Sequence, residues 1–116
     1  MKSLLLAFMF AALPLAAADV SGVWKVDGDI AGNPVKPSCT LKQEENKLSG
    51  VCKSELGDSP LKGEVDGKKV KFTYDVEFNG QKYTLAYVAE LTSDTELKGT
   101  IDVGVAAGDF TAMKES

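Results

Sequence analysis

Apolar and polar residues alternate along most of this chain from Val20 onward, in short runs separated by turn residues. A period of two is typical of β-strands that bury one face, and no stretch shows the longer period of an amphipathic helix. The pattern therefore predicts an all-β domain. Eight strands are expected, near residues 20–27, 37–44, 47–54, 60–65, 68–78, 81–92, 96–103 and 109–114, with the longest loops at 27–37 and 104–108.

The clearest predicted hairpin turns at Asn79-Gly80. This dipeptide tolerates the positive φ angles of a type I′ turn, whose twist matches that of the flanking strands. A two-residue turn at this point pairs apolar residues on one face and charged residues on the other. The apolar pairs are Val76 with Tyr83, Tyr74 with Leu85, Phe72 with Tyr87 and Val70 with Ala89, and the charged pair is Glu77 with Lys82.

A second hairpin is predicted at Asp66-Gly67, one strand earlier. Its expected register pairs Leu61 with Phe72 and Gly63 with Val70 inside, and Glu64 with Lys69 outside. Both hairpins place the same face of the shared strand inward.

An eight-stranded meander must protect its edge strands or close on itself, and closure removes the edges. We therefore expect a small up-and-down antiparallel barrel; a two-sheet β-sandwich would satisfy the same pattern. Three Leu-x-Gly phrases fit either fold, as places where an inward glycine lets the sheet bend. They are Leu48-Ser49-Gly50, Leu61-Lys62-Gly63 and Leu97-Lys98-Gly99.

The two cysteines flank a third predicted hairpin, with its turn at Glu45-Asn46. This turn places Cys39 directly opposite Cys52 in a non-hydrogen-bonded pair, where Cα atoms approach to about 4.5 Å. That separation suits a disulfide, so we expect one. A redox-active or metal-binding pair is the alternative, although the spacing is not C-x-x-C.

The N-terminus has the features of a removable secretory signal. Lys2 precedes an uncharged apolar run from Leu4 to Pro14, and Ala16-Ala17-Ala18 before Asp19 is typical of a signal-peptidase site. The run is too short for a membrane span. We expect a cleaved signal peptide over residues 1–18, a single domain over residues 19–116, and a periplasmic or extracellular location in which a disulfide persists.

Charge and composition argue against several functions. Without Lys2 the chain has 12 of its 13 lysines against 17 acidic residues, and it has no arginine. Such an acidic surface lacks the bidentate groups that hold phosphates and bases, so no nucleic-acid partner is expected. The chain also has no histidine, the commonest general base and transition-metal ligand. We expect no catalytic residues, no metal site and no cofactor; the Asp27-Gly28-Asp29 run departs from a calcium loop at Ala31 and Ser38.

Aromatic residues form the candidate binding site. They share the inward face of the predicted barrel, where they could line a pocket for a small apolar or aromatic ligand or simply fill the interior. These residues are Trp24, Phe72, Tyr74, Tyr83 and Tyr87.

The opening Gly22-Val23-Trp24 resembles the calycin superfamily of lipocalins, fatty-acid-binding proteins and avidins. Leu48-Ser49-Gly50 and Gly108-Asp109-Phe110-Thr111 are similar to the second hairpin and last strand of the avidins. The resemblance implies a barrel closed at one end by Trp24 and a ligand bound inside. It implies no biotin site, because such sites use several tryptophans and this chain has one.

The chain also resembles small periplasmic barrel inhibitors of secreted metalloproteases, in Gly22, Trp24 and the pair Cys39 and Cys52. Those inhibitors insert an N-terminal segment into the protease, whereas only residues 19–21 precede the Gly-x-Trp here. This resemblance implies a secreted protein partner. For a protein-binding module, loops 28–37 and 104–108 at one rim are the expected contact surface. The leading expectation is a non-enzymatic ligand-binding barrel, and the alternative is a protein-binding module such as a hydrolase inhibitor.

Overall fold

The computed structural model describes residues 19–115, which form nine β-strands and no helix. The strands are β1 (Gly22–Ile30), β2 (Asn33–Val35), β3 (Ser38–Glu44), β4 (Lys47–Ser54), β5 (Gly57–Asp66), β6 (Lys69–Phe78), β7 (Gln81–Ser93), β8 (Glu96–Asp102) and β9 (Ala107–Lys114). The expected signal peptide, residues 1–18, lies outside the described part of the chain. No helix within residues 19–115 is long and apolar enough to cross a membrane.

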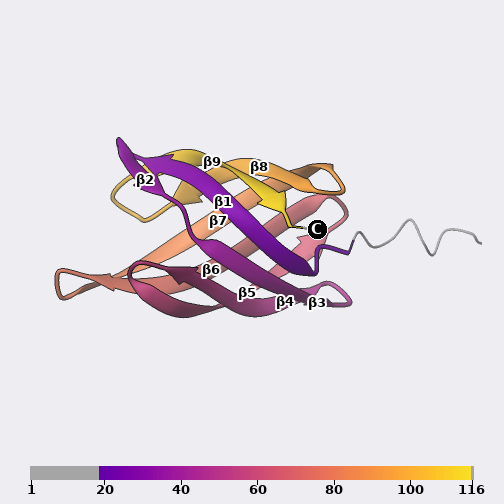
Figure 1. The fold of residues 1–116 in the computed structure, drawn as a ribbon, viewed down its shortest axis with the longest axis horizontal. Coiled ribbons are helices and arrows are strands. Elements are labelled where there is room, and N and C mark those ends of the chain that lie inside the picture. The colour runs from indigo at the N-terminus through magenta and orange to yellow at the C-terminus, as the bar shows by residue number, and fades with distance from the viewer. Residues whose placement is uncertain (1–18, 116) are drawn as a thin grey trace, which may run out of the picture.

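Eight of the strands form a closed up-and-down barrel (Figure 1). These eight strands are β1 and β3 to β9, and each pairs antiparallel with the next of them along the chain, so that β1 pairs with β3. The barrel closes where β1 pairs with β9, from Trp24 opposite Lys114 to Ile30 opposite Gly108. This last pairing leaves neither the first nor the last strand as an open edge. The predicted barrel is confirmed, and the sandwich is not formed.

The ninth strand, β2, corrects the prediction of a long loop over residues 27–37. β1 continues to Ile30, and a tight turn at Ala31-Gly32 sends the chain back so that Ile30 pairs with Asn33. Both turn residues have positive φ, 53° and 87°. Asp27-Gly28-Asp29 therefore lies within a strand. The sequence pattern concealed this turn because alanine rarely occupies the left-handed region.

The β6–β7 hairpin has the predicted register. Asn79 and Gly80 both have positive φ, and the four apolar pairs and the Glu77–Lys82 pair form as expected. The β3–β4 hairpin is also confirmed, with Glu44 opposite Lys47 and Cys39 opposite Cys52.

The predicted β5–β6 register is wrong by two residues. Leu61 lies opposite Tyr74, Gly63 opposite Phe72, and Glu64 opposite Lys71. The turn falls at Gly67-Lys68, with Gly67 at φ 62°. A glycine at the first central position is typical of a type II′ turn, which competes with the type I′ turn expected of Asp-Gly. A shift of two preserves the inward face, so the core composition is unaffected.

The inward glycines of the Leu-x-Gly phrases allow neighbouring strands to approach closely. A Cβ atom on Gly50, Gly63 or Gly99 would overlap a backbone carbonyl oxygen of the adjacent strand, that of Thr40, Lys71 or Val88 respectively. On β4 and β5 the phrases also interlock, since Leu48 lies opposite Gly63 and Gly50 opposite Leu61. A side chain at any of these three positions would therefore force the adjacent strands apart.

The two ends of the barrel differ. One end, which we call the Trp24 end, carries the turns at residues 45–46, 67–68 and 94–95. Val20 is fully buried there, and its carbonyl oxygen accepts a 2.8 Å hydrogen bond from Nε1 of Trp24. The opposite end, the open end, carries the β1–β2, β4–β5 and β6–β7 turns and the β8–β9 loop. The β6–β7 hairpin extends farthest beyond the barrel, on the left of Figure 1.

Candidate functional site

An aromatic stack fills the middle of the barrel. The rings of Phe72 and Tyr87 are stacked with centroids 4.5 Å apart, and the ring of Tyr74 also stacks on Tyr87, with centroids 5.5 Å apart. Phe110 meets Tyr87 edge-on at 5.0 Å. All four side chains are buried. The sequence left two roles open for the aromatic residues, lining a ligand pocket or filling the interior. Phe72 and Tyr87 fill the interior.

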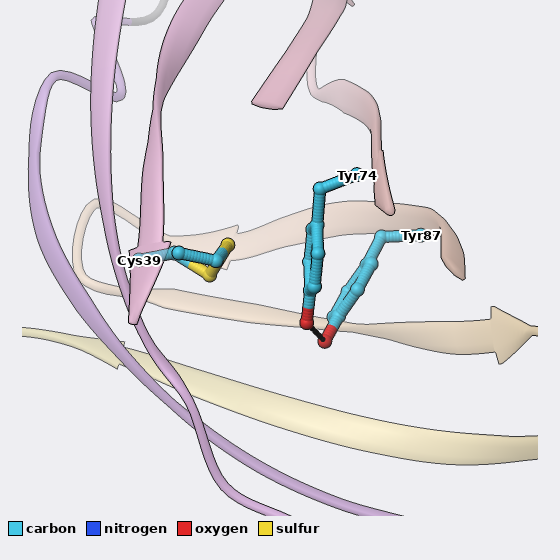
Figure 2. The surroundings of a disulfide bond; sticks show 4 residues. Cys39, Tyr74 and Tyr87 are labelled. Atoms are coloured by element: carbon cyan, nitrogen blue, oxygen red, sulfur yellow. Dashed lines mark hydrogen bonds between the residues drawn. A yellow bond between two sulfur atoms is a disulfide. The ribbon is translucent and has the colours of Figure 1, made fainter. Parts of the chain in front are cut away.

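The hydroxyl groups of Tyr74 and Tyr87 meet inside this stack, with their oxygens 2.6 Å apart. Figure 2 shows the two rings side by side with their hydroxyl tips in contact, and Cys39 projecting into the same interior space from another strand. Burial raises the pKa of both phenols above the ordinary value of 10.0, because removal from water disfavours the phenolate. Both groups therefore remain neutral hydrogen-bonding groups across the physiological range.

The disulfide forms one wall of this interior. Cys39 and Cys52 are bonded across β3 and β4 with their Cα atoms 4.0 Å apart, and both side chains are buried. The disulfide is part of a row of paired residues across four strands, because Trp24 lies opposite Cys39 and Ser59 lies opposite Cys52. The predicted disulfide is confirmed in the structure.

A cleft of about 420 Å³ opens at the open end of the barrel. Its inner wall comes from Tyr74 and Leu85, which are buried, and from the half-buried Val76. The remaining wall consists of the β2–β3 connection, the β4–β5 turn and the end of β6. These residues are Pro34, Val35, Lys36, Pro37, Ser54, Glu55, Leu56 and Phe78. The volume falls in the range of small-molecule sites, and the lining is largely apolar.

The structure separates the five aromatic residues that the sequence placed together. Tyr74 belongs to both the stack and the cleft wall, whereas Phe72 and Tyr87 lie in the core and are not cleft-lining residues. Trp24 is buried near the opposite end. Tyr83 lies on the extended part of the hairpin, half-buried, and its hydroxyl donates to Oε1 of Gln81 at 2.8 Å.

Several cleft residues were not singled out from the sequence. Val76 and Leu85 share the inward face with Tyr74 in the predicted hairpin, so alternation alone could have identified them. Leu56 and Phe78 carried a different signal, since they are large apolar residues next to turns and remain about half exposed, at 51% and 52%.

A second, more open hollow of about 490 Å³ lies on the outer surface along β1, β2 and β9. Its lining includes Asp27, Asp29 and Asp109, and the last two lie directly opposite each other in the β1–β9 pairing. One oxygen of Asp29 accepts a hydrogen bond from the backbone of Gly32. Within residues 19–115, no group of three or more acidic, histidine or cysteine side chains could hold a metal ion.

Comparison with known proteins supports the fold. The structure is similar to a solved structure described as a redesigned β-barrel, with a TM-score of 0.69 and 15% sequence identity over 88% of this chain and 96% of that chain. At this identity the likeness concerns the fold alone. The sequence matches no protein-family model, and a search of curated proteins finds no match.

Proposed function

We propose that this protein is an exported, non-enzymatic β-barrel that binds a small apolar or aromatic ligand in the cleft at its open end. The observation that carries the proposal is the cleft itself, in which Tyr74, Val76 and Leu85 form an apolar inner wall. Clefts of this size lined by apolar and aromatic side chains, with a few polar groups, are the usual sites of small-molecule binding. The calycin-like Gly22-Val23-Trp24 opening supports the same function by resemblance.

Binding of an apolar probe tests this proposal. We expect 2-ethylnaphthalene to bind the oxidised protein with one-to-one stoichiometry in isothermal titration calorimetry. Leu56→Asp should weaken binding several-fold, because it places a charge in the cleft wall at a position that tolerates exposure. Val88→Asp is the matched control, since Val88 is 47% exposed and lies away from the cleft. Absence of binding, or equal affinity in the two variants, would contradict the proposal.

Export is the second part of the proposal. The buried disulfide is consistent with an oxidising compartment, where such bonds form and persist. Expression of the full chain in a bacterium, followed by N-terminal sequencing of the periplasmic protein, should yield Asp19 as the first residue. Retention of residues 1–18 on a cytoplasmic product would overturn this part.

A protein-binding module is the second candidate function. Three large apolar side chains are exposed at the open end, and Val105 is 86% exposed. Leu56 lies in the β4–β5 turn, Val105 in the β8–β9 loop and Phe78 at the end of β6. Exposed apolar residues that share one rim are typical of protein contacts. The segment before Gly22 does not favour insertion into a protease cleft, because the backbone N–H of Val20 donates to Gln43 and its side chain is buried. Inhibition of a secreted hydrolase that Val105→Asp abolishes, with probe binding unchanged, would favour this second function over the first.

A further inference from the structure

The tyrosine pair has one more hydrogen-bond donor than it uses. Each phenol carries one O–H proton and can also accept hydrogen bonds. The two oxygens share a single hydrogen bond, and among residues 19–115 neither hydroxyl has another partner. One of the two protons therefore has no acceptor in the described part of the chain. Leaving a buried donor unpaired is costly, so this proton favours any acceptor that can reach it.

Only Tyr74 can present the unused proton to the cleft. Either hydroxyl of the pair could donate the shared hydrogen bond. Tyr74 lines the cleft and Tyr87 does not, so an acceptor bound there would meet Tyr74. When Tyr87 donates to Tyr74, the O–H of Tyr74 is left to donate to an occupant of the cleft.

The surroundings of this donor favour a neutral acceptor. Leu85 and Val76 flank Tyr74 on the inner wall. Among the described residues that line the cleft, Lys36 is the only basic one; it is exposed, and its Nζ lies 3.9 Å from Oδ1 of Asp27. Glu55 adds a negative charge to the same lining. A carboxylate placed beside Tyr74 would thus lose its hydration without gaining a cation.

We propose that the cleft selects neutral ligands that combine an apolar body with a hydrogen-bond acceptor, such as a ketone, ester or ether oxygen, which accepts the proton of the Tyr74 hydroxyl. This inference rests on the proposed function and narrows it. It assigns Tyr74 as the specificity-determining residue.

Three probes with one ring system test the inference. They are 2-ethylnaphthalene, which has no acceptor, 2-acetylnaphthalene, which has a neutral acceptor, and 2-naphthoate, which has an anionic one. The quantity to compare between variants is the Kd of 2-ethylnaphthalene divided by the Kd of 2-acetylnaphthalene. The two probes differ in hydration, but this difference is the same for every variant and cancels in the comparison. We expect Tyr74→Phe to lower this ratio about fivefold, the factor that corresponds to a hydrogen bond of about 1 kcal/mol.

Tyr87→Phe serves as the matched control, since it removes the other hydroxyl of the same pair. The ratio should remain within about twofold of the unsubstituted protein. A ratio that is unchanged in Tyr74→Phe, or that falls only in Tyr87→Phe, would overturn the assignment of the donor. Binding of 2-naphthoate as tight as that of 2-acetylnaphthalene would overturn the selection of neutral ligands.

The failure of this inference differs from the failure of the proposed function. If all three probes bind and Leu56→Asp weakens each, but Tyr74→Phe leaves the ratio unchanged, the cleft is a binding site without this selectivity. If no probe binds, both proposals fail. Should Tyr74→Phe not fold, the infrared carbonyl band of 2-acetylnaphthalene bound to the unsubstituted protein decides. A band lowered from its position in hydrocarbon solvent supports the hydrogen bond, and an unshifted band overturns it.

Discussion

The hydroxyl groups of Tyr74 and Tyr87 lie 2.6 Å apart, although the two residues are not directly opposite each other in the β6–β7 hairpin. Phe72 faces Tyr87 and Leu85 faces Tyr74, so the tyrosines meet along the diagonal of the pairing. This diagonal lets a polar pair form inside an aromatic stack. It also connects the packed middle of the barrel with the cleft, because Tyr74 contributes to both.

Stability should decline at alkaline pH because of this pair. Burial raises both phenol pKa values above 10.0, so the folded chain retains protons that the unfolded chain releases near that pH. The stabilisation is complete below the unfolded pKa and is lost as pH rises above it, by up to about 1.4 kcal/mol per pH unit for each tyrosine.

Urea unfolding at about pH 8 and about pH 11 measures this decline. Tyr87→Phe should show a smaller loss between the two pH values than the unsubstituted protein, because one raised pKa is removed. Since the two proteins differ only at position 87, the difference isolates the tyrosine. An equal loss in the two proteins would show that Tyr87 is not shielded from solvent.

Reduction of the Cys39–Cys52 bond should destabilise the barrel by about 3 kcal/mol, through the loop-closure entropy that the bond removes from the unfolded chain. The urea midpoint of the protein with and without reductant measures this change. The double variant Cys39→Ala, Cys52→Ala should have a midpoint that does not respond to reductant. Two reactive thiols in the native, untreated protein would contradict the disulfide.

Gly63→Ala should cost about 3 kcal/mol, because the added Cβ would overlap the carbonyl oxygen of Lys71 and the backbone of Phe72. Gly67→Ala is the matched control. Gly67 has φ 62° and open space around it, so its substitution introduces only backbone strain of about 1 kcal/mol. Denaturant unfolding compares the two, and a smaller loss for Gly63→Ala than for Gly67→Ala would contradict the close approach of the strands.

Trp24→Phe should separate stability from ligand binding. The change removes the hydrogen bond from Nε1 to the carbonyl oxygen of Val20 and reduces the volume of a side chain that is 1% exposed. A loss of about 2 kcal/mol is expected. The affinity for 2-acetylnaphthalene should stay within about twofold, because Trp24 is not a cleft-lining residue. A large loss of affinity in a folded variant would show that Trp24 contributes to the binding site.

The sequence alone was sufficient to predict the register of two strands where that register depended on a local turn. Asn79-Gly80 and Glu45-Asn46 each join adjacent strands, and the resulting registers were predicted residue by residue, including Cys39 opposite Cys52. The β5–β6 register differed because Asp66-Gly67-Lys68 can form two turns that differ by two residues in register. Alternation could not distinguish them, since both bury the same face.

The cleft could not be predicted in this way. Its wall brings together residues 34–37, residues 54–56 and the end of β6, which are far apart in sequence and meet only because the barrel closes. The same closure places Trp24 and Tyr74 toward different ends, although both belong to the inward face. A shared face is a local property of strands, whereas position along the barrel axis depends on strand tilt and register around the whole barrel.

Mapping the amide and methyl NMR shifts of the oxidised protein on addition of 2-acetylnaphthalene tests the ligand site most directly. We predict that the largest changes occur at the cleft residues Val35, Leu56, Val76, Phe78 and Leu85. The turns of the Trp24 end, at residues 45–46, 67–68 and 94–95, should remain unperturbed. No saturable change, or changes centred on that end, would contradict a ligand site in the cleft.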